Sequence, residues 1–424
     1  MRIRKLYLKD IGPFDEVEFE FKPQQSGRAE IHILTGPNGC GKTTTLQALT
    51  NCEGVRNSEL LAKRFRSGVS SEIQIFMTES PELNPKIVRI RPKDLPKSGI
   101  PNILNTQSKK RKWAAFAYTG YRIVASSKIN AIQDFPENPL SEALDFNKRS
   151  TRGDGAIPFL GNSGAFTINQ WIANNISKRA LEKEKANTNQ ANKYASSIER
   201  LENVISEIIG YKINFDLRTS PLSLVVLANN TELDFDVLPD GLRSAISWIG
   251  DVLMRLDLIS WEEDHPVNEQ NIILFLDEIE VHLHPAWQRR ILPAVQKLFS
   301  NAQIFLTTHS PFVVNSVDGA WIYELKVKEG KAYLGEVTQS KSGTSYQNVL
   351  REVFDIDEDF GAPAQADLDK FYQSRDAILQ GDEVNETAFL RLAKKLAQQG
   401  VELQNIVIFE LRQLNKIKNK TYEI

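Results

Sequence analysis

The sequence has little of what marks secreted and membrane proteins. Its 424 residues include only two cysteines, Cys40 and Cys52, which excludes a disulfide framework and favours a reducing compartment. No apolar run reaches the ~18 residues that a membrane-spanning helix needs. The first residues also lack the apolar stretch of a secretory signal. We therefore expect a soluble, cytoplasmic protein.

An excess of charge of one sign is also absent. The chain has 52 Lys and Arg and 54 Asp and Glu residues, a balance that argues against bulk binding to nucleic acid. Two local basic patches remain, at 109–112 beside Trp113 and in a tail with Lys416, Lys418 and Lys420. Each is interpreted either as a solvated segment or as a contact to nucleic-acid phosphates.

Apolar patterns predict a globular α/β chain. With 41% hydrophobic residues it can bury a sizeable core, and its length allows up to about three domains. Segments 166–209 predict a helical hairpin with a linker at 187–190, and three short strands follow at 213–217, 222–227 and 233–237. Helices are predicted at 347–354, 364–379, 386–398 and 402–416. Residues 130–164, rich in Asn, Pro, Gly and Ser, predict long loops.

A glycine-rich segment at 36–43, Gly-Pro-Asn-Gly-Cys-Gly-Lys-Thr, matches G-x-x-x-x-G-K-[ST] in full. It lies between an apolar strand predicted at 31–34 and a predicted helix, which is the context that this phosphate-binding pattern requires. Backbone N–H groups of such a loop curl around phosphate oxygens, and the helix start adds positive partial charge. Lys42 can reach the β- and γ-phosphates, and the Thr43 hydroxyl can ligate Mg²⁺.

A second segment ends in two acids. Residues 272–276 form a continuous apolar run, typical of a strand buried on both faces of a parallel sheet, and Asp277 and Glu278 follow. In a P-loop enzyme the first acid holds Mg²⁺ and the second accepts a proton from the attacking water. A solvated acidic turn is the alternative, and the P-loop in the same chain disfavours it.

Two further motifs carry polar groups toward the same predicted site. Thr-Thr-His-Ser-Pro follows a strand predicted at 304–306, so His309 lies where parallel strands end and ligand crevices form. There it can hydrogen-bond the γ-phosphate or position the attacking water. Leu-Pro-Asp-Gly-Leu-Arg-Ser at 238–244 opens an amphipathic helix. It is either an ordinary turn with an N-cap aspartate or a helix start that faces the nucleotide of a partner subunit.

The order of these motifs resembles the soluble ABC-type ATPases related to RecF and SMC head domains. Residues 277–290 are similar to bacterial antiphage-defence ATPases of the Septu and retron-associated type, and to the ATPase domain of overcoming-lysogenization-defect proteins. The resemblance covers 1–50 and about 205–330 well. It implies an α/β, ABC-type P-loop NTPase head with an inserted helical hairpin and a C-terminal helical extension. The implied parts are an N-terminal lobe at 1–165, the hairpin at 166–210, a C-terminal lobe at 211–345 and the extension at 346–424.

The resemblance also implies roles for particular residues, with ATP and Mg²⁺ as cofactors. Glu278, His309 and Lys42 are the expected catalytic residues, and Thr43 and Asp277 the expected metal ligands. Asp240, Gly241 and Arg243 form the expected signature that acts in trans, where Pro239 replaces the usual serine. No glutamine is placed in the loop between the lobes; Tyr118 and Arg122 are candidates to substitute for it, with a buried strand end as the alternative. The expected ATP-binding residues are Gly36, Asn38, Gly39, Cys40, Gly41, Lys42, Thr43 and Thr44.

The function that the resemblance implies is a Mg-dependent ATPase that dimerises around ATP and regulates a separately encoded nuclease in antiphage defence. A RecF-like DNA-repair or DNA-structuring ATPase is the alternative, and the Glu-x-His-x-His-Pro element disfavours a transporter subunit. The 80 residues after Thr344 are helical by pattern and leave no room for an α/β nuclease domain. The expected docking surface for the partner lies within 347–416, with an apolar stripe at Phe389, Leu392 and Leu396. Packing of that stripe on the ATPase is the alternative.

Overall fold

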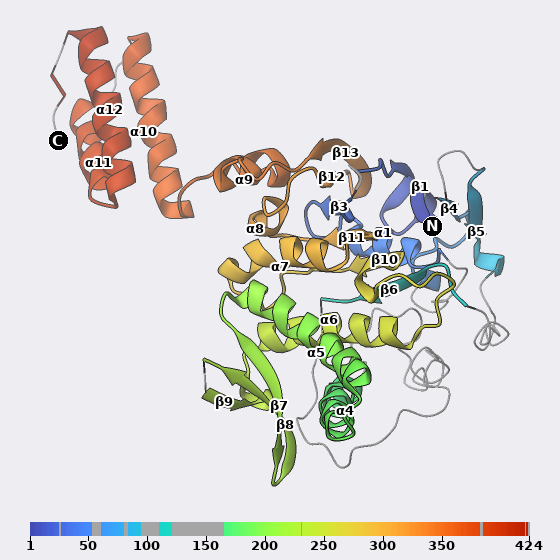
Figure 1. Ribbon diagram of the computed structural model, residues 1–424. Helices are drawn as coiled ribbons and strands as arrows, with labels where there is room; N and C mark the ends of the chain where they lie inside the picture. The colour runs from blue at the N-terminus through green and yellow to red at the C-terminus, as the bar shows by residue number, and fades with distance from the viewer. Residues whose placement is uncertain are drawn as a thin grey trace. The chain divides into compact units, whose positions relative to one another are not determined.

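The computed structural model describes residues 1–24, 27–52, 61–79, 84–94, 110–120, 165–229, 231–381, 385–419 and 421–422. Lys109, Arg122, Lys420 and the loops predicted at 130–164 lie outside these residues. The chain divides into two compact units, Met1–Val349 and Leu350–Ile424. Figure 1 shows the elements of both.

A ten-stranded sheet forms the frame of Met1–Val349, with the order β5-β4-β1-β2-β13-β12-β3-β11-β10-β6. Strands β6, β10, β11, β3 and β12 run parallel to one another, and the remaining neighbours pair mainly antiparallel. The strands are β1 (Arg2–Ile11), β2 (Phe14–Glu20), β3 (Glu30–Thr35), β4 (Glu72–Thr78), β5 (Lys86–Ile90), β6 (Ala114–Tyr118), β10 (Ile272–Leu276), β11 (Ala302–Thr307), β12 (Trp321–Lys328) and β13 (Lys331–Gln339). Every residue of β6, β10 and β11 is buried, as the continuous apolar run of a central parallel strand predicts.

Helices cover the parallel part of this sheet (Figure 1). Helix α1 (Lys42–Leu49) follows β3, and α7 (Pro285–Leu298) connects β10 to β11 as the parallel crossover that the sequence predicts. Helix α6 (Asp240–Leu258) leads toward β10 through the short η5 turn (Val267–Glu269), and α8 (Pro311–Val314) follows β11. None of the helices in the described part of the chain is long and apolar enough to cross a membrane.

The predicted hairpin consists of α4 (Ala165–Glu184) and α5 (Thr188–Ile209), and α5 packs on α6 and α7. The sequence predicts the linker between these helices at 187–190, but α5 already begins at Thr188. The Asn187 side chain caps α5 by accepting the N–H of Gln190 (3.5 Å). After the hairpin, β7 (Ile213–Thr219), β8 (Leu222–Ala228) and β9 (Thr231–Asp234) form a separate antiparallel sheet. The strand predicted at 233–237 ends early, since Phe235–Val237 forms a 3₁₀ turn that buries Phe235.

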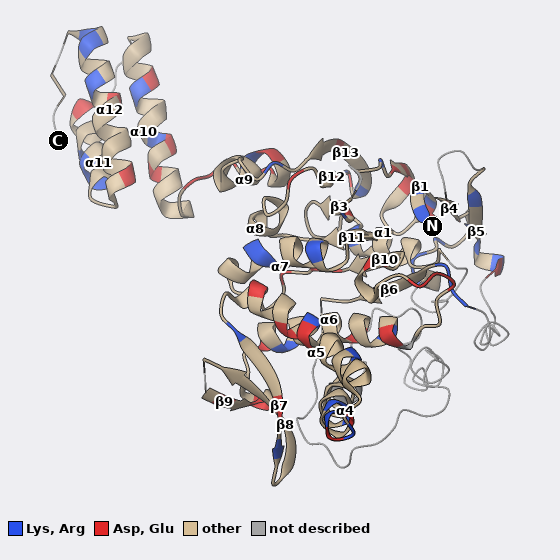
Figure 2. Cartoon of the chain, in the orientation of Figure 1, with Lys and Arg blue, Asp and Glu red and all other residues tan. Residues whose placement is uncertain are grey.

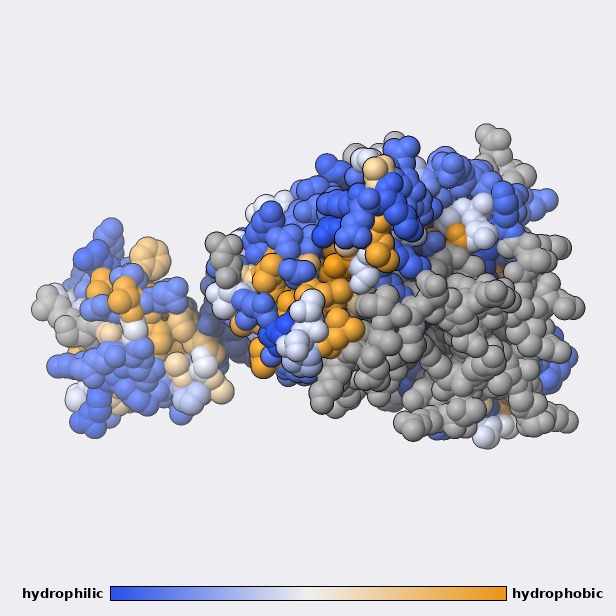
Figure 3. Space-filling view, turned by 60° about the horizontal axis from the view of Figure 1, so that its bottom comes forward, coloured by the Kyte–Doolittle hydropathy of each residue, from blue (hydrophilic) through white to orange (hydrophobic). Residues whose placement is uncertain are grey.

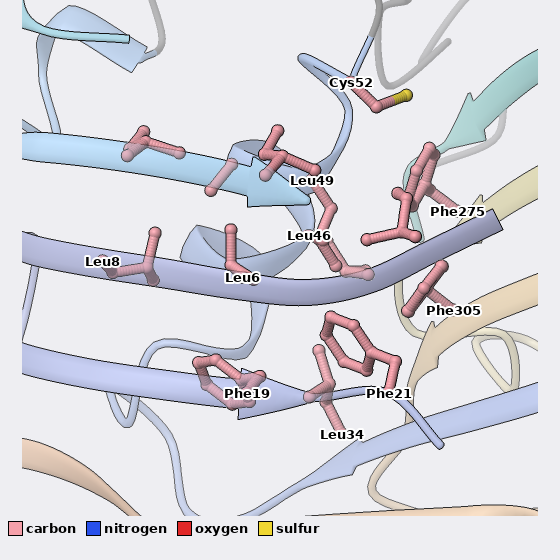
Figure 4. Packing of buried hydrophobic residues seen from close by; sticks show 14 of the residues in the cluster. Leu6, Leu8, Phe19, Phe21, Leu34, Leu46, Leu49, Cys52, Phe275 and Phe305 are labelled. Carbon is pink, nitrogen blue, oxygen red and sulfur yellow. The ribbon is translucent and has the colours of Figure 1, made fainter. Parts of the chain in front are cut away.

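The main hydrophobic core joins the two parts of the large sheet. Side chains of β1 and β2, such as Leu6 and Phe19, meet Leu46 of α1 and Phe275 and Phe305 of the parallel strands. Figure 4 shows these groups around the same space. Helix α1 is therefore held from both sides, which fixes the end of the glycine-rich loop from which it starts. Figure 3 shows one face of the molecule, where an apolar area interrupts a mostly hydrophilic surface.

The unit Leu350–Ile424 has an apolar core of its own, formed by α10 (Ala362–Gln380), α11 (Glu386–Ala397) and α12 (Val401–Lys418). Helix α9 (Tyr346–Phe354) spans the junction between the units. Phe389 and Leu396 are 2% and 0% exposed in that core, and Leu392 packs against it. The stripe is therefore the inner face of α11: it packs within its own unit and is not itself an exposed docking surface. Docking of a partner elsewhere on 347–416 stays a prediction.

Candidate nucleotide-binding site

Four neighbouring parallel strands bring the sequence motifs to one edge of the sheet. In the order β3-β11-β10-β6, their C-terminal ends lead into the glycine-rich loop, His309, the Asp277-Glu278 pair and Tyr118. Backbone hydrogen bonds continue past the strand ends, because the N–H of Asp277 donates to the carbonyl of Tyr118 (2.9 Å). The edge is thus a continuous, well-bonded surface at the position where ligands bind to parallel sheets.

The glycine-rich loop is closed by Lys42, the first residue of α1. Its ammonium donates to the carbonyls of Gly36 (2.8 Å) and Pro37 (2.9 Å), and only 7% of the residue is exposed. Asn38 and Gly39 lie at the exposed tip of the loop, whereas the Cys40 thiol is fully buried, and this burial raises its pKa. A buried thiol faces the core, so any contact of Cys40 with phosphate has to come from its backbone.

Thr43 and Asp277 meet across β11. The Thr43 hydroxyl donates to both carboxylate oxygens of Asp277, at 3.2 and 3.0 Å. Mg–O bonds of ~2.1 Å at right angles place two oxygens about 3 Å apart, so this pair has the spacing of adjacent Mg²⁺ ligands. A hydroxyl and a carboxylate are also hard oxygen donors of the kind that Mg²⁺ prefers. The residues present therefore fit the metal that the sequence predicts.

Thr307 organises the acidic pair, a role that sequence reasoning missed. Its hydroxyl donates to Asp277 (2.6 Å) and accepts the N–H of Glu278 (2.8 Å). Glu278 itself has a φ of +46°, in the left-handed region that costs a non-glycine residue energy. The hydrogen bond from its N–H helps to hold this conformation. The only signal in the sequence is that Thr307 lies in the Thr-Thr-His-Ser-Pro motif.

His309 is exposed at the same edge, and its backbone is held by a second residue that the sequence analysis did not single out. The N–H of His309 donates to the Glu280 carboxylate (2.6 Å). Desolvation and the positive charge of Lys42 lower the pKa of His309, while the charge of Glu278 opposes this. The charges of both Lys42 and Glu278 therefore act on the imidazole. A lowered pKa favours the neutral imidazole, which suits a hydrogen-bonding role.

Glu280 and Gln288 tie the acidic loop to the histidine loop. Burial raises the pKa of Glu280 despite the N–H of His309, and its other carboxylate oxygen is buried without a partner among the described residues. The Gln288 amide donates to the carbonyl of Leu283 (2.9 Å) and accepts the Ser310 hydroxyl (2.6 Å). The Glu-x-His-x-His-Pro element thus works partly as a brace for His309.

The predicted signature lies at the start of α6, and its contacts here are with its own chain. A Cβ on Gly241 would come within 2.3 Å of the His282 carbonyl, so only glycine allows the helix to approach this loop so closely. Arg243 pairs with Asp240, and its Nε is buried without a partner among the described residues. Asp240, Gly241 and Arg243 therefore adjoin the 280s loop rather than the glycine-rich loop.

Burial decides the hypothesis for Tyr118, whereas the two interpretations of the basic run stay open. The Tyr118 hydroxyl donates to Asp251 of α6 (2.8 Å) and the residue is 2% exposed, so Tyr118 is a buried strand end and does not face a nucleotide. In the basic run, Arg111 exchanges backbone hydrogen bonds with 260 and 262, and Lys112 pairs with Glu262 (3.9 Å). In the view of Figure 2, Lys and Arg are interspersed with Asp and Glu over most of the helices and strands.

Three known proteins illustrate what this chain is similar to. The Retron Ec83 probable ATPase of Escherichia coli is 39% identical over 113 residues, which cover 27% of this chain and 21% of that protein. The Septu protein PtuA of Bacillus thuringiensis is 21% identical over 370 residues, covering 84% and 85%. The SMC head domain from Thermotoga maritima is 14% identical at a TM-score of 0.42, covering 80% of this chain and 100% of that one. The chain thus spans only about a fifth of the first relative's length.

Family comparison covers the two halves of the site. A model described as "AAA domain" matches residues 1–52, and one described as "AAA domain, putative AbiEii toxin, Type IV TA system" matches 96–315. The expected resemblance to ATPases of antiphage defence is confirmed by these matches, and the α/β P-loop fold by the sheet that carries the motifs. Since the second model matches more than half of the chain, the chain belongs to the AAA-domain family that it describes.

Proposed function

We propose that the chain is a Mg²⁺-dependent ATPase that converts ATP and water to ADP and inorganic phosphate. One observation carries the proposal. Lys42, the hydrogen-bonded Thr43–Asp277 pair, Glu278 and His309 lie along one sheet edge, and each group matches a need of phosphoryl transfer. Positive charge, a metal position, a proton acceptor and a hydrogen-bonding group for the γ-phosphate are all present.

Each residue acts in a distinct way in this proposal. Lys42 leaves the loop carbonyls and compensates charge on the β- and γ-phosphates. Thr43 and Asp277 hold Mg²⁺, which when bound neutralises phosphate charge. Glu278 accepts a proton from the attacking water, and Thr307 keeps its backbone in the required conformation. His309, neutral because of its lowered pKa, hydrogen-bonds the γ-phosphate or the water.

We further propose that two copies sandwich two nucleotides. Support comes from the exposure of the signature side of the molecule: the Asp240 side chain is 67% exposed, and Val237, three residues earlier, is 68% exposed. In this arrangement Asp240, Gly241 and Arg243 would reach the γ-phosphate bound by the other copy.

We also propose a role in a bacterial antiphage system, in the cytoplasm, with a separately encoded nuclease as partner. The names of the relatives, a retron ATPase and a Septu protein, support only the defence part of this proposal. A RecF-like DNA-repair or DNA-structuring ATPase is the alternative, with nucleic acid as the partner. Co-purification with the product of an adjacent nuclease gene would favour defence. ATPase stimulation by DNA without any such partner would favour repair.

The test of the ATPase proposal is phosphate release by the purified chain with Mg²⁺ and with a chelator. We expect steady turnover with Mg²⁺ and none without it. Light scattering measures the mass of the particle, which should double when ATP is bound if two copies form a dimer. A chain that binds ATP but shows no metal-dependent phosphate release would contradict the assignment of Asp277 and Glu278, and one that binds no ATP would contradict the whole proposal.

A further inference from the structure

Tyr118 makes contacts in two directions at once. Its backbone carbonyl accepts the N–H of Asp277 (2.9 Å), and its hydroxyl donates to the Asp251 carboxylate of α6 (2.8 Å). The ring lies near Trp248 of the same helix, with centroids 6.0 Å apart. One residue therefore connects the strand end that bears the acidic pair to the middle of the helix that begins with the signature.

The Tyr118 hydroxyl ends at a buried ion pair. Arg255 donates to Asp251 through Nε (2.5 Å) and Nη2 (3.1 Å), and the two side chains are 1% and 2% exposed. Burial acts to lower the pKa of Arg255, but Asp251 and Tyr118 outweigh it and the pKa is raised, so the guanidinium stays charged. A buried, fully charged pair keeps its geometry, because moving either partner away leaves an uncompensated charge.

The 277–283 loop makes two further close contacts, one with the chain after β6 and one with α6. A Cβ on Gly120 would come within 2.8 Å of the Glu278 carboxylate, so the chain after Tyr118 packs directly on the proposed proton acceptor. At the other end, Gly241 of α6 packs on the carbonyl of His282, whose φ is +64°. Helix α6 is thus fastened to the 277–283 loop at its first turn and near its middle.

We propose that Tyr118 is a positioning residue that couples the acidic loop to the signature helix, through its carbonyl on Asp277 and its hydroxyl on the Asp251–Arg255 pair. The coupling rests on the proposed ATPase function and adds a route for regulation. A change at Glu278 when ATP is bound or cleaved moves α6, and α6 carries the residues that serve the other copy's nucleotide. The two sites of a dimer then respond to each other.

The test is Tyr118→Phe in the full chain. This variant keeps the ring on Trp248 and the carbonyl on Asp277, and it removes only the hydroxyl. The control is Tyr323→Phe, because Tyr323 is another fully buried tyrosine, on β12. Its hydroxyl donates to the backbone carbonyl of Glu20 (3.0 Å) and lies 3.2 Å from Nδ1 of His32, and neither of these contacts involves α6. Steady-state ATP turnover gives kcat and KM for both.

For Tyr118→Phe we expect kcat to fall about tenfold, which corresponds to ~1.4 kcal/mol of lost transition-state stabilisation, with KM for ATP within about twofold. Tyr323→Phe should keep kcat within about twofold of the unmodified chain. Hydrogen exchange with a non-hydrolysable ATP analogue gives a second measurement. The analogue should slow exchange at 242–245 in the unmodified chain. In Tyr118→Phe that effect should be lost, while slowing at 38–44 persists.

Several results would overturn the proposal. Turnover and exchange of Tyr118→Phe that match the unmodified chain would mean that the hydroxyl carries no coupling. An equal loss of kcat in both tyrosine variants would mean general destabilisation, and a rise in KM alone would mean a contact with nucleotide. Should Tyr118→Phe fail to fold, Asp251→Asn replaces it with the same expected loss of kcat, and unchanged kcat there would equally reject the coupling. Absence of turnover in the unmodified chain would instead reject the ATPase proposal.

Discussion

The units Met1–Val349 and Leu350–Ile424 bury different kinds of side chain. Among the described residues, every buried polar or charged residue belongs to the first unit, including Lys42, Asp277 and Arg255. In the second unit the buried side chains are apolar, and Phe371 and Phe389 stack at its centre (5.1 Å between centroids). Burying a polar group costs free energy unless it is paired. The first unit therefore spends more of its stability on placing polar groups than the second, whose core is mainly apolar.

This difference separates two kinds of variant. At the sheet edge of Met1–Val349, polar changes should affect ATP turnover strongly and stability little. In Leu350–Ile424, apolar changes should affect stability and leave turnover unchanged. The following predictions test that separation.

Lys42→Ala should have the largest effect. Removing the ammonium leaves the phosphate charge uncompensated at a partly desolvated loop, and we expect turnover to fall by ~100-fold or more, as for other lost electrostatic contacts to a transition state. Phosphate release and ATP binding measure this. Lys63→Ala, which changes an exposed lysine, is the control and should behave as the unmodified chain. Turnover of Lys42→Ala at the unmodified rate would refute the site.

Glu278→Gln should keep ATP binding and lose hydrolysis. The amide retains the shape but not the proton-accepting carboxylate, and loss of a general base costs about 10²–10⁴-fold in rate. Because ATP then persists, light scattering should detect a larger particle with ATP than without it. A variant that hydrolyses ATP normally, or one that keeps its size with ATP, would contradict the role of Glu278 or the dimer.

Phe389→Ala should show the opposite behaviour in the other unit. Phe389 is 2% exposed, and removing a buried aromatic ring costs ~3–5 kcal/mol of stability. Calorimetry or limited proteolysis should therefore detect early unfolding of Leu350–Ile424, with ATP turnover unchanged. Phe409→Ala is the matched control in the same unit, because Phe409 is 58% exposed. Equal destabilisation by both variants would argue against the apolar core.

Ending the chain after Phe354 keeps α9 whole and removes α10 to α12. Because the sheet edge lies entirely in Met1–Val349, turnover should stay within about twofold, the range of a change away from the reacting groups. Loss of co-purification with a partner would assign docking to the removed helices. A soluble truncated chain without ATPase activity would contradict the prediction that the second unit is not needed for turnover.

The smallest effect concerns the stability of Glu280→Gln as a function of pH. The pKa of Glu280 is raised by burial above its ordinary 4.5, so its ionisation destabilises the folded chain as the pH rises through the folded-state pKa. Glutamine does not ionise. The melting temperature of the variant relative to the unmodified chain should therefore rise from pH 4.5 toward pH 8. If the melting temperature of the variant instead falls relative to the unmodified chain as the pH rises, the pKa of Glu280 is lowered in the folded chain and not raised.

The sequence was informative where a feature is local. The glycine-rich loop, the apolar run before Asp277 and the strand before His309 each depend on neighbouring residues, and the structure places all three at one edge. Distant pairs outside the recognised motifs could not be predicted. Tyr118 and Asp251 are 133 residues apart, and nothing near either one indicates the other. The apolar stripe of α11 was seen, but sequence periodicity does not say which neighbour covers it.

Strand β11 separates the strand that leads to the P-loop from the strand that leads to Asp277. Adjacent strands are ~4.8 Å apart, so about 10 Å of sheet lies between β3 and β10, and Thr307 fills the gap. Inserting one residue early in β11 would turn its side chains to the opposite face and put Leu306 where the Thr307 hydroxyl now lies. Grafting this site onto another scaffold would therefore require the length and register of β11 as well as the glycine-rich loop and the acidic pair.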